Sequence, residues 1–147
     1  MNNEIKYNNE IKYINKIIPN QKPEKYYGNK EYKRLLILKG TNEQKINNIK
    51  KKASQMLFRL FEGNGKALYI LGIDDNGDIY GLNNNELEIT INNFKKIVKE
   101  IDAKIKIIRI YEGYNKNKKF KGYVCAARIY LPNEILINKN ENIFNFN

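Results

Sequence analysis

Histidine and tryptophan are absent from this 147-residue chain, and cysteine occurs once, as Cys125. Without histidine the chain cannot build Ser-His or Cys-His catalytic pairs, and it lacks a common zinc ligand. A single cysteine excludes an internal disulfide. Its place in an apolar stretch indicates a small buried core residue, as expected in a reducing compartment.

Long apolar runs are also missing from the sequence. No stretch approaches the roughly 20 apolar residues that a membrane-spanning helix needs, and the first residues lack the pattern of a secretory signal peptide. We therefore expect a cytoplasmic protein that has no membrane partner.

Acidic residues are few compared with basic ones. The chain has 16 Asp and Glu against 27 Lys and Arg, which gives a formal net charge of +11. A surplus of this size attracts polyanions, of which RNA is the simplest candidate.

A glycine-bounded stretch at residues 63–82 organises the rest of the chain. Residues 67–73 are almost wholly apolar and predict a central strand. Asn76-Gly77 supplies the positive-φ residues of a tight turn, and residues 78–82 predict a second strand. Gly72 and Gly81 indicate places where another backbone comes close.

Two helices flank this stretch. Thr41-x-x-Gln44 is a capping box that opens the first helix, and Asn83 or Asn84 caps the second. Apolar residues recur at helical spacing in both. With further strands at 30–39, 104–111 and 123–131, the order is strand-helix-strand-strand-helix-strand-strand. It predicts a single α+β domain with a mixed five-stranded sheet and two helices on one face.

The chain ends on either side of this domain differ from it in composition. Residues 2–13 repeat NNEIKY twice, and we interpret residues 1–29 as a low-complexity extension that is disordered alone. Residues 132–147 form a second expected flexible tail, which leaves 30–131 as the folded domain. Either tail could dock on ribosomal proteins.

The stretch between the last two strands is the leading candidate for RNA contacts. Its cations and aromatics suit phosphate contacts combined with base stacking. The alternative is a solvated, lysine-rich loop. The candidate residues are Lys116, Lys118, Lys119, Lys121, Tyr114 and Phe120.

The polar face of the first helix is a second candidate. Phe58 lies off the apolar stripe, among amides and cations, as a base-stacking residue would. Alternatively, Phe58 packs under the N-terminal extension. The candidate residues on this face are Lys51, Lys52, Gln55, Phe58 and Arg59.

Several motifs keep a familiar order and spacing. They are residues 55–65 (QMLFRLFEGNG), 67–69 (ALY), 72–77 (GIDDNG), 81–82 (GL), 86–88 (ELE) and 31–33 (EYK). Together they resemble the N-terminal domain of the translational GTPases called GTP-binding proteins 1 and 2, over about residues 30–131. The resemblance implies an accessory module that associates with RNA or ribosomes.

One departure from that family limits what carries over. The chain has no Walker A loop, G-x-x-x-x-G-K-[ST]. Residues 63–66 (GNGK) lack its spacing and precede a strand rather than a helix. We therefore do not expect GTP hydrolysis.

The same core is similar, more distantly, to the AlbA-like domain of Schlafen proteins, some of which cut tRNA and rRNA. That resemblance implies a metal-dependent ribonuclease, using Mg or Mn held by Glu31, Asp74 and Asp75. Tyr26 stands near the place of the family's second glutamate, and Glu24 is only nearby. The alternative for the aspartates is turn chemistry.

Three functional hypotheses follow. The first is a non-catalytic protein without cofactors that binds rRNA in the ribosome, or tRNA, and acts as a dormancy or stalling factor. The second is the metal-dependent ribonuclease. The third is a protein-interaction adaptor whose tails wrap a partner.

Overall fold

The computed structural model describes residues 10–132, which form one five-stranded sheet and two helices. The predicted α+β class, with a mixed sheet, is confirmed. The expected flexible ends at 1–9 and 133–147 lie outside the described residues. The elements in chain order are β1 (Ile11–Ile18), β2 (Lys30–Lys33), α1 (Asn42–Glu62), β3 (Lys66–Leu71), α2 (Asn84–Glu100), β4 (Lys104–Tyr114) and β5 (Phe120–Tyr130).

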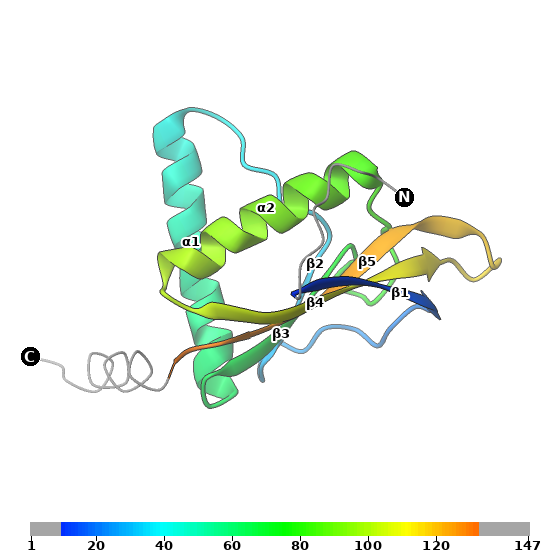
Figure 1. Ribbon diagram of the computed structural model, residues 1–147, viewed down its shortest axis with the longest axis horizontal. Helices are drawn as coiled ribbons and strands as arrows, with labels where there is room; N and C mark the ends of the chain where they lie inside the picture. The colour runs from blue at the N-terminus through cyan, green and yellow to red at the C-terminus, as the bar shows by residue number, and fades with distance from the viewer. Residues whose placement is uncertain (1–9, 133–147) are drawn as a thin grey trace, which may run out of the picture.

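The strand order across the sheet is β1-β4-β5-β3-β2. The three inner strands pair antiparallel, and each edge strand joins its neighbour in parallel. Both helices cover the same face of the sheet (Figure 1), as expected. Among the described residues, no helix is long and apolar enough to cross a membrane.

Both helices begin with a complete capping box. Thr41 Oγ1 accepts from Gln44 N at 3.2 Å, and the Gln44 side chain accepts from Thr41 N at 2.8 Å. Asn83 and Glu86 repeat the arrangement at 2.8 and 3.0 Å. Each box satisfies two backbone N–H groups that have no partner within the helix, so the predicted helix starts are confirmed.

The main core lies between the helices and the sheet. Tyr69 of β3 packs on Phe94 of α2 with ring centroids 5.4 Å apart. Leu71 and Cys125, which pair across β3 and β5, are fully buried. Burial raises the pKa of the Cys125 thiol, so this cysteine stays neutral as a core residue.

One of the five strands, β1, comes from residues 11–18 and not from the stretch 78–82 that was predicted to form a strand. Residues 11–18 form β1, so the interpretation of 1–29 as an extension outside the folded domain is wrong for this part. Ile11 pairs with Ile108 of β4 and is almost fully buried. The physical reason is alternation: Ile11 and Tyr13 stand two apart, which suits a strand with one buried face.

Two other predicted strands are shorter than expected. The stretch 78–82 makes only isolated bridges, Ile73 with Ile79 and Leu82 with Tyr123. Gly81 has a φ of 81° and turns the chain toward β5, where a Cβ on it would lie 2.2 Å from the Lys121 carbonyl oxygen. The close approach predicted at this glycine is therefore present, and it ends the hairpin early. The strand expected at 30–39 stops at Lys33.

Part of the second sheet face is covered by the β1–β2 connection. Gln21 N donates to the Gly77 carbonyl at 2.7 Å, and Asn20 Oδ1 accepts from Ile79 N at 3.0 Å. These contacts hold residues 20–21 against the turn at 74–78. Beneath them lies a small group of buried side chains outside the main core: Tyr32, Ile73, Ile79 and Val124.

Candidate nucleic-acid interface

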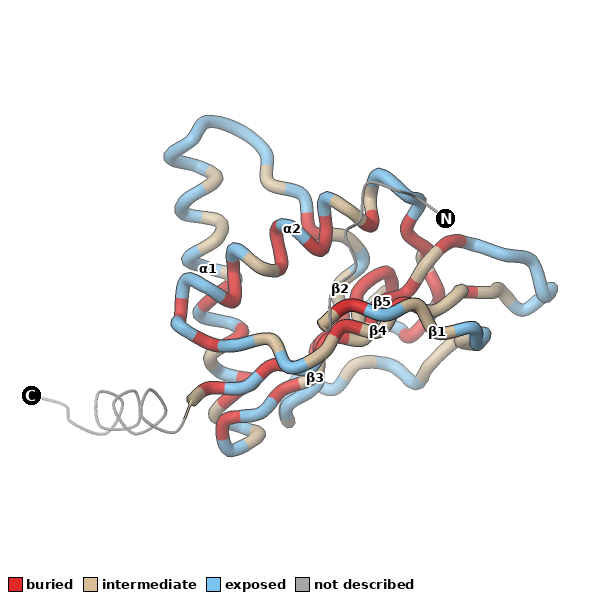
Figure 2. The backbone as a smooth tube through the Cα atoms, viewed as in Figure 1, coloured by how far each residue is buried: buried red, intermediate tan, exposed pale blue. Residues whose placement is uncertain are grey.

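The predicted lysine-rich loop is the exposed tip of the β4–β5 hairpin, seen as pale blue at the far end of that hairpin in Figure 2. Asn115 Oδ1 shapes the tip by accepting from the backbone N–H groups of Asn117 and Lys119, at 2.9 and 3.0 Å. Its four lysines form no ion pair with any described carboxylate. They are Lys116, Lys118, Lys119 and Lys121.

An aromatic row supports the hairpin tip. Phe120 contacts Tyr114 and Tyr123 edge to face, with centroids 5.7 and 5.5 Å apart. Tyr123 continues the row to Tyr13 of β1, at 5.8 Å. Phe120 lies between Tyr114 and Tyr123 in this row and remains 49% exposed. Its ring is thus held in place by neighbours while part of it stays open to solvent.

The predicted α1 patch is only partly on the surface. Lys51, Gln55 and Phe58 are exposed. Phe58 is 50% exposed, so the described part of the N-terminal segment does not bury it. Burial, followed by the nearby Lys33 and Lys51 charges, lowers the pKa of Lys52. In Figure 1 this patch and the hairpin tip lie toward opposite ends of the long axis.

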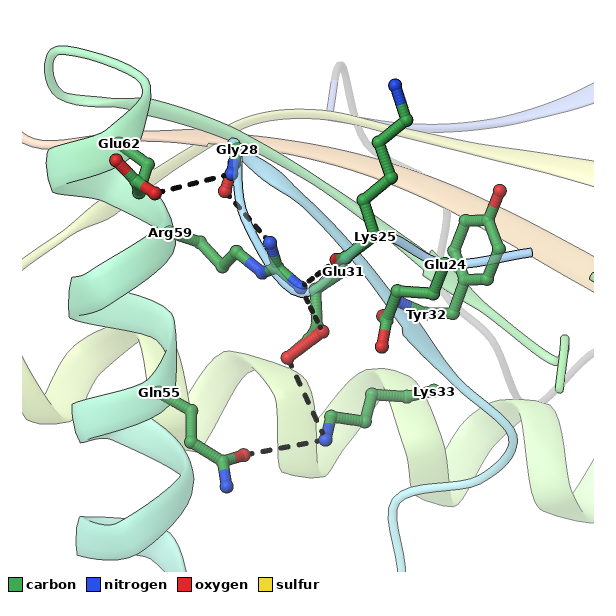
Figure 3. Close-up of polar contacts among 9 residues, drawn as sticks. All are labelled: Glu24, Lys25, Gly28, Glu31, Tyr32, Lys33, Gln55, Arg59 and Glu62. Carbon is green, nitrogen blue, oxygen red and sulfur yellow. Dashed lines mark hydrogen bonds and ion pairs between the residues drawn. The ribbon is translucent and has the colours of Figure 1, made fainter. Parts of the chain in front are cut away.

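Arg59 is not an RNA-contact residue, which corrects the prediction. It is only 4% exposed, and its guanidinium donates to the carbonyl oxygens of Gly28 and Lys25 at 2.9 and 2.8 Å (Figure 3). The same group donates to Glu31 Oε2 at 3.1 Å. The segment before β2 folds against α1, and this packing takes Arg59 out of solvent.

The carboxylates of the ribonuclease alternative do not form one site. Glu31 is 8% exposed and paired with Arg59, and Asp74 binds Arg34 Nε. Asp75 is exposed at the turn. Within residues 10–132 there is no group of three His, Cys, Asp or Glu side chains that could hold a metal ion.

Glu24 lies closer to Glu31 than the sequence indicated. Its carboxylate accepts from Tyr32 N on the outer edge of β2. Burial, then hydrogen bonding to Glu31, raises the pKa of Glu24 to about 7, although the Tyr32 N–H favours the charged form. The two carboxyl groups therefore repel each other more strongly when both are ionised.

Sequence reasoning missed a second basic surface, on the sheet face opposite the helices. Tyr69 and Ala127 pair on the helix side, so the pairs one and three positions away face the opposite side: Leu68 with Arg128, and Lys66 with Tyr130. The neighbouring strands add Lys30 opposite Leu68 and Lys104 opposite Tyr130. Cations at alternate strand positions are the sequence signal, but they identify a shared face only once the register is known. The cations on this face are Lys12, Lys30, Lys66, Lys104, Arg109 and Arg128.

The fold and these surfaces define a small, basic α+β protein. No protein-family model matches the chain. Over 91 residues, 62% of its length, it is 31% identical to GTP-binding protein 2 of Mus musculus and to GTP-binding protein 2 of Homo sapiens. The match spans only 14% of the length of each relative. The similarity links the chain to part of a GTP-binding protein, as the sequence motifs indicated.

Proposed function

We propose that this protein binds RNA without catalysing a reaction on it, and that its RNA is ribosomal or transfer RNA. The observation that carries the proposal is the β4–β5 hairpin tip, where four unpaired lysines surround a half-exposed phenylalanine. Lysines without carboxylate partners are free to replace the counterions of phosphates. Phe120 offers an adjacent apolar ring on which a base can stack.

The link to translation is supported by the similarity to part of GTP-binding protein 2. A basic module that binds the ribosome, without a Walker A loop to hydrolyse GTP, could occupy a factor site or a tRNA site. We therefore propose a role as a dormancy or stalling factor. We do not propose the ribonuclease, because Glu31 and Asp74 are each held by an arginine in separate ion pairs.

Sedimentation with ribosomes tests the proposal. The native chain should pellet with ribosomes at low salt and be released at high salt, because its contacts are electrostatic. Changing the four tip lysines to glutamine should move the protein to the supernatant. The tip lysines are Lys116, Lys118, Lys119 and Lys121.

A matched control keeps the same loss of charge at another place. Four exposed lysines on the helical side of the molecule, changed to glutamine, should leave sedimentation close to that of the native chain. They are Lys39, Lys50, Lys96 and Lys99. Equal loss in both variants would show a response to net charge alone and would contradict a binding site at the hairpin tip.

A further inference from the structure

A cavity of about 610 Å³ opens at the uncovered end of the basic sheet face. It lies where β3 begins, β5 ends and β4 begins, at the opposite end of β4 and β5 from the hairpin tip. Its polar lining comes from the side chains Lys66, Lys106, Arg128, Tyr130, Asn29 and Asn64. A volume in this range is ordinary for a small-ligand site, which is typically about 300–1,000 Å³.

A local irregularity in β4 positions Lys106 at the cavity. The register between β4 and β5 shifts between Ile105, which pairs with Ile129, and Ile107, which pairs with Arg128. Lys106 is thus an extra residue without a partner of its own in the ladder. A bulge of this kind redirects a side chain. Here it brings Lys106 to the same cavity as Arg128.

The charges in the cavity are of one sign. Within residues 10–132 no carboxylate lines the cavity, and none of its three cations forms an ion pair. Three uncompensated cations around one concave site create a positive potential that favours an anion with several acceptor oxygens. Arg128, with its planar fork of donors, suits a phosphate group in particular.

Tyr130 adds an aromatic surface next to these cations. It is 38% exposed, and it pairs with Lys66 on one side and with Lys104 on the other. Proteins that bind single-stranded nucleic acids combine an aromatic ring with phosphate-binding cations, because each base presents a flat face that can stack on the ring. A base inside a duplex is already stacked on both sides and cannot lie on this ring.

We propose that this cavity binds one unpaired nucleotide of RNA, with its phosphate held by Lys106 and Arg128 and its base stacked on Tyr130. This subsite rests on the proposed RNA binding and adds to it a preference for single strands. The lysines of the hairpin tip contact phosphates of either kind of RNA, and Tyr130 in the cavity adds a second ring, besides Phe120, for an unpaired base.

The test compares a labelled single-stranded oligouridylate with a blunt RNA duplex of equal nucleotide number, both titrated with the full chain by fluorescence anisotropy. Tyr130→Ala should weaken binding of the single strand by about five-fold or more, as loss of one stacked base does. Duplex binding should change by less than about two-fold, within ordinary mutational variation. Tyr130→Phe keeps the ring and should retain single-strand binding.

The outcomes separate the subsite from the proposed function. Equal affinity of Tyr130→Ala and the native chain for the single strand would overturn the subsite alone. Failure of the native chain to bind either RNA would overturn RNA binding itself. If Tyr130→Ala does not fold, Lys106→Gln serves in its place, since Lys106 is exposed in the bulge. It should lower the salt slope for the single strand by about 0.7, and an unchanged slope would overturn the subsite.

Discussion

The guanidinium of Arg59 on α1 lies 3.1 Å from the Glu31 carboxylate on β2, and both side chains are buried. The same guanidinium binds the carbonyl oxygens of Lys25 and Gly28. A single arginine therefore joins the helix, an edge strand and the segment that leads into that strand (Figure 3). Its role is to hold these three parts together.

Arg59→Ala should destabilise the protein by about 3 kcal/mol, because it leaves the buried Glu31 carboxylate with only Lys33, at 4.0 Å, as an ion-pair partner. Denaturant unfolding measures the loss. Arg59→Lys keeps the charge but not the planar fork of donors, so its unfolding free energy should lie between those of the native chain and Arg59→Ala. A variant that unfolds like the native chain but no longer binds RNA would show that Arg59 is an RNA-contact residue after all.

Phe58 neighbours Arg59 in the chain but is half exposed, so its substitution should act differently. If the α1 patch stacks on RNA, as we expect, Phe58→Ala costs about 1–3 kcal/mol of binding. Stability should stay within about 0.5 kcal/mol of native, as is usual for a surface change. Unchanged affinity together with a lowered melting temperature would assign Phe58 to packing alone.

The stability that Glu24 contributes at the edge strand β2 should depend on pH. The folded-state pKa of Glu24 is raised from 4.5 to about 7, so the folded chain holds this proton more tightly than the unfolded chain does. The resulting stability is present in full below the unfolded-state pKa and is lost as the pH rises through about 7. Glu24→Gln stays neutral and escapes this loss.

Unfolding free energies of the native chain and Glu24→Gln, measured from about pH 4.5 to about pH 8, test this expectation. As the pH rises, the unfolding free energy of Glu24→Gln should gain about 1 kcal/mol relative to that of the native chain, after allowance for solvent screening of a partly exposed group. Glu100→Gln, an exposed change at the end of α2, serves as the control. A pH-independent difference would show that Glu24 and Glu31 do not share a proton.

Purified protein should not cleave tRNA or structured rRNA when Mg²⁺ or Mn²⁺ is added. The structure engages Glu31 and Asp74 in separate ion pairs, and a metal site needs several converging oxygen ligands. Asp75 is exposed at the turn, so Asp75→Asn should change stability by only a few tenths of a kcal/mol. Metal-dependent cleavage that disappears in Glu31→Gln would restore the ribonuclease hypothesis.

Local signals in the sequence were sufficient for the helices. The capping boxes at Thr41 and Asn83 depend on residues within one turn of each other, and the structure contains both. The turn at Asn76-Gly77 is equally local, but only Gly77 adopts the positive φ that was expected of both residues. The fold class could be predicted from these elements because two helices and several strands can pack in only a few layer arrangements.

Long-range packing decided what the sequence could not show. β1 forms because an edge of β4 is available to pair with it, whereas the polar repeat in which β1 begins resembles a disordered tail. Helical spacing placed Arg59 on the polar face of α1, correctly for an isolated helix, but residues 25–28 then cover it. The basic sheet face was missed for the same reason, since strand register and the bulge at Lys106 are tertiary features.

The salt dependence of RNA affinity tests the central claim most directly. Log affinity should fall linearly with log salt concentration for the native chain. Neutralising the four lysines of the hairpin tip should flatten that slope by about 3, because each lost phosphate contact removes about 0.7–0.9. An unchanged slope in that variant would remove the hairpin tip from the interface and contradict the proposed function at its main site.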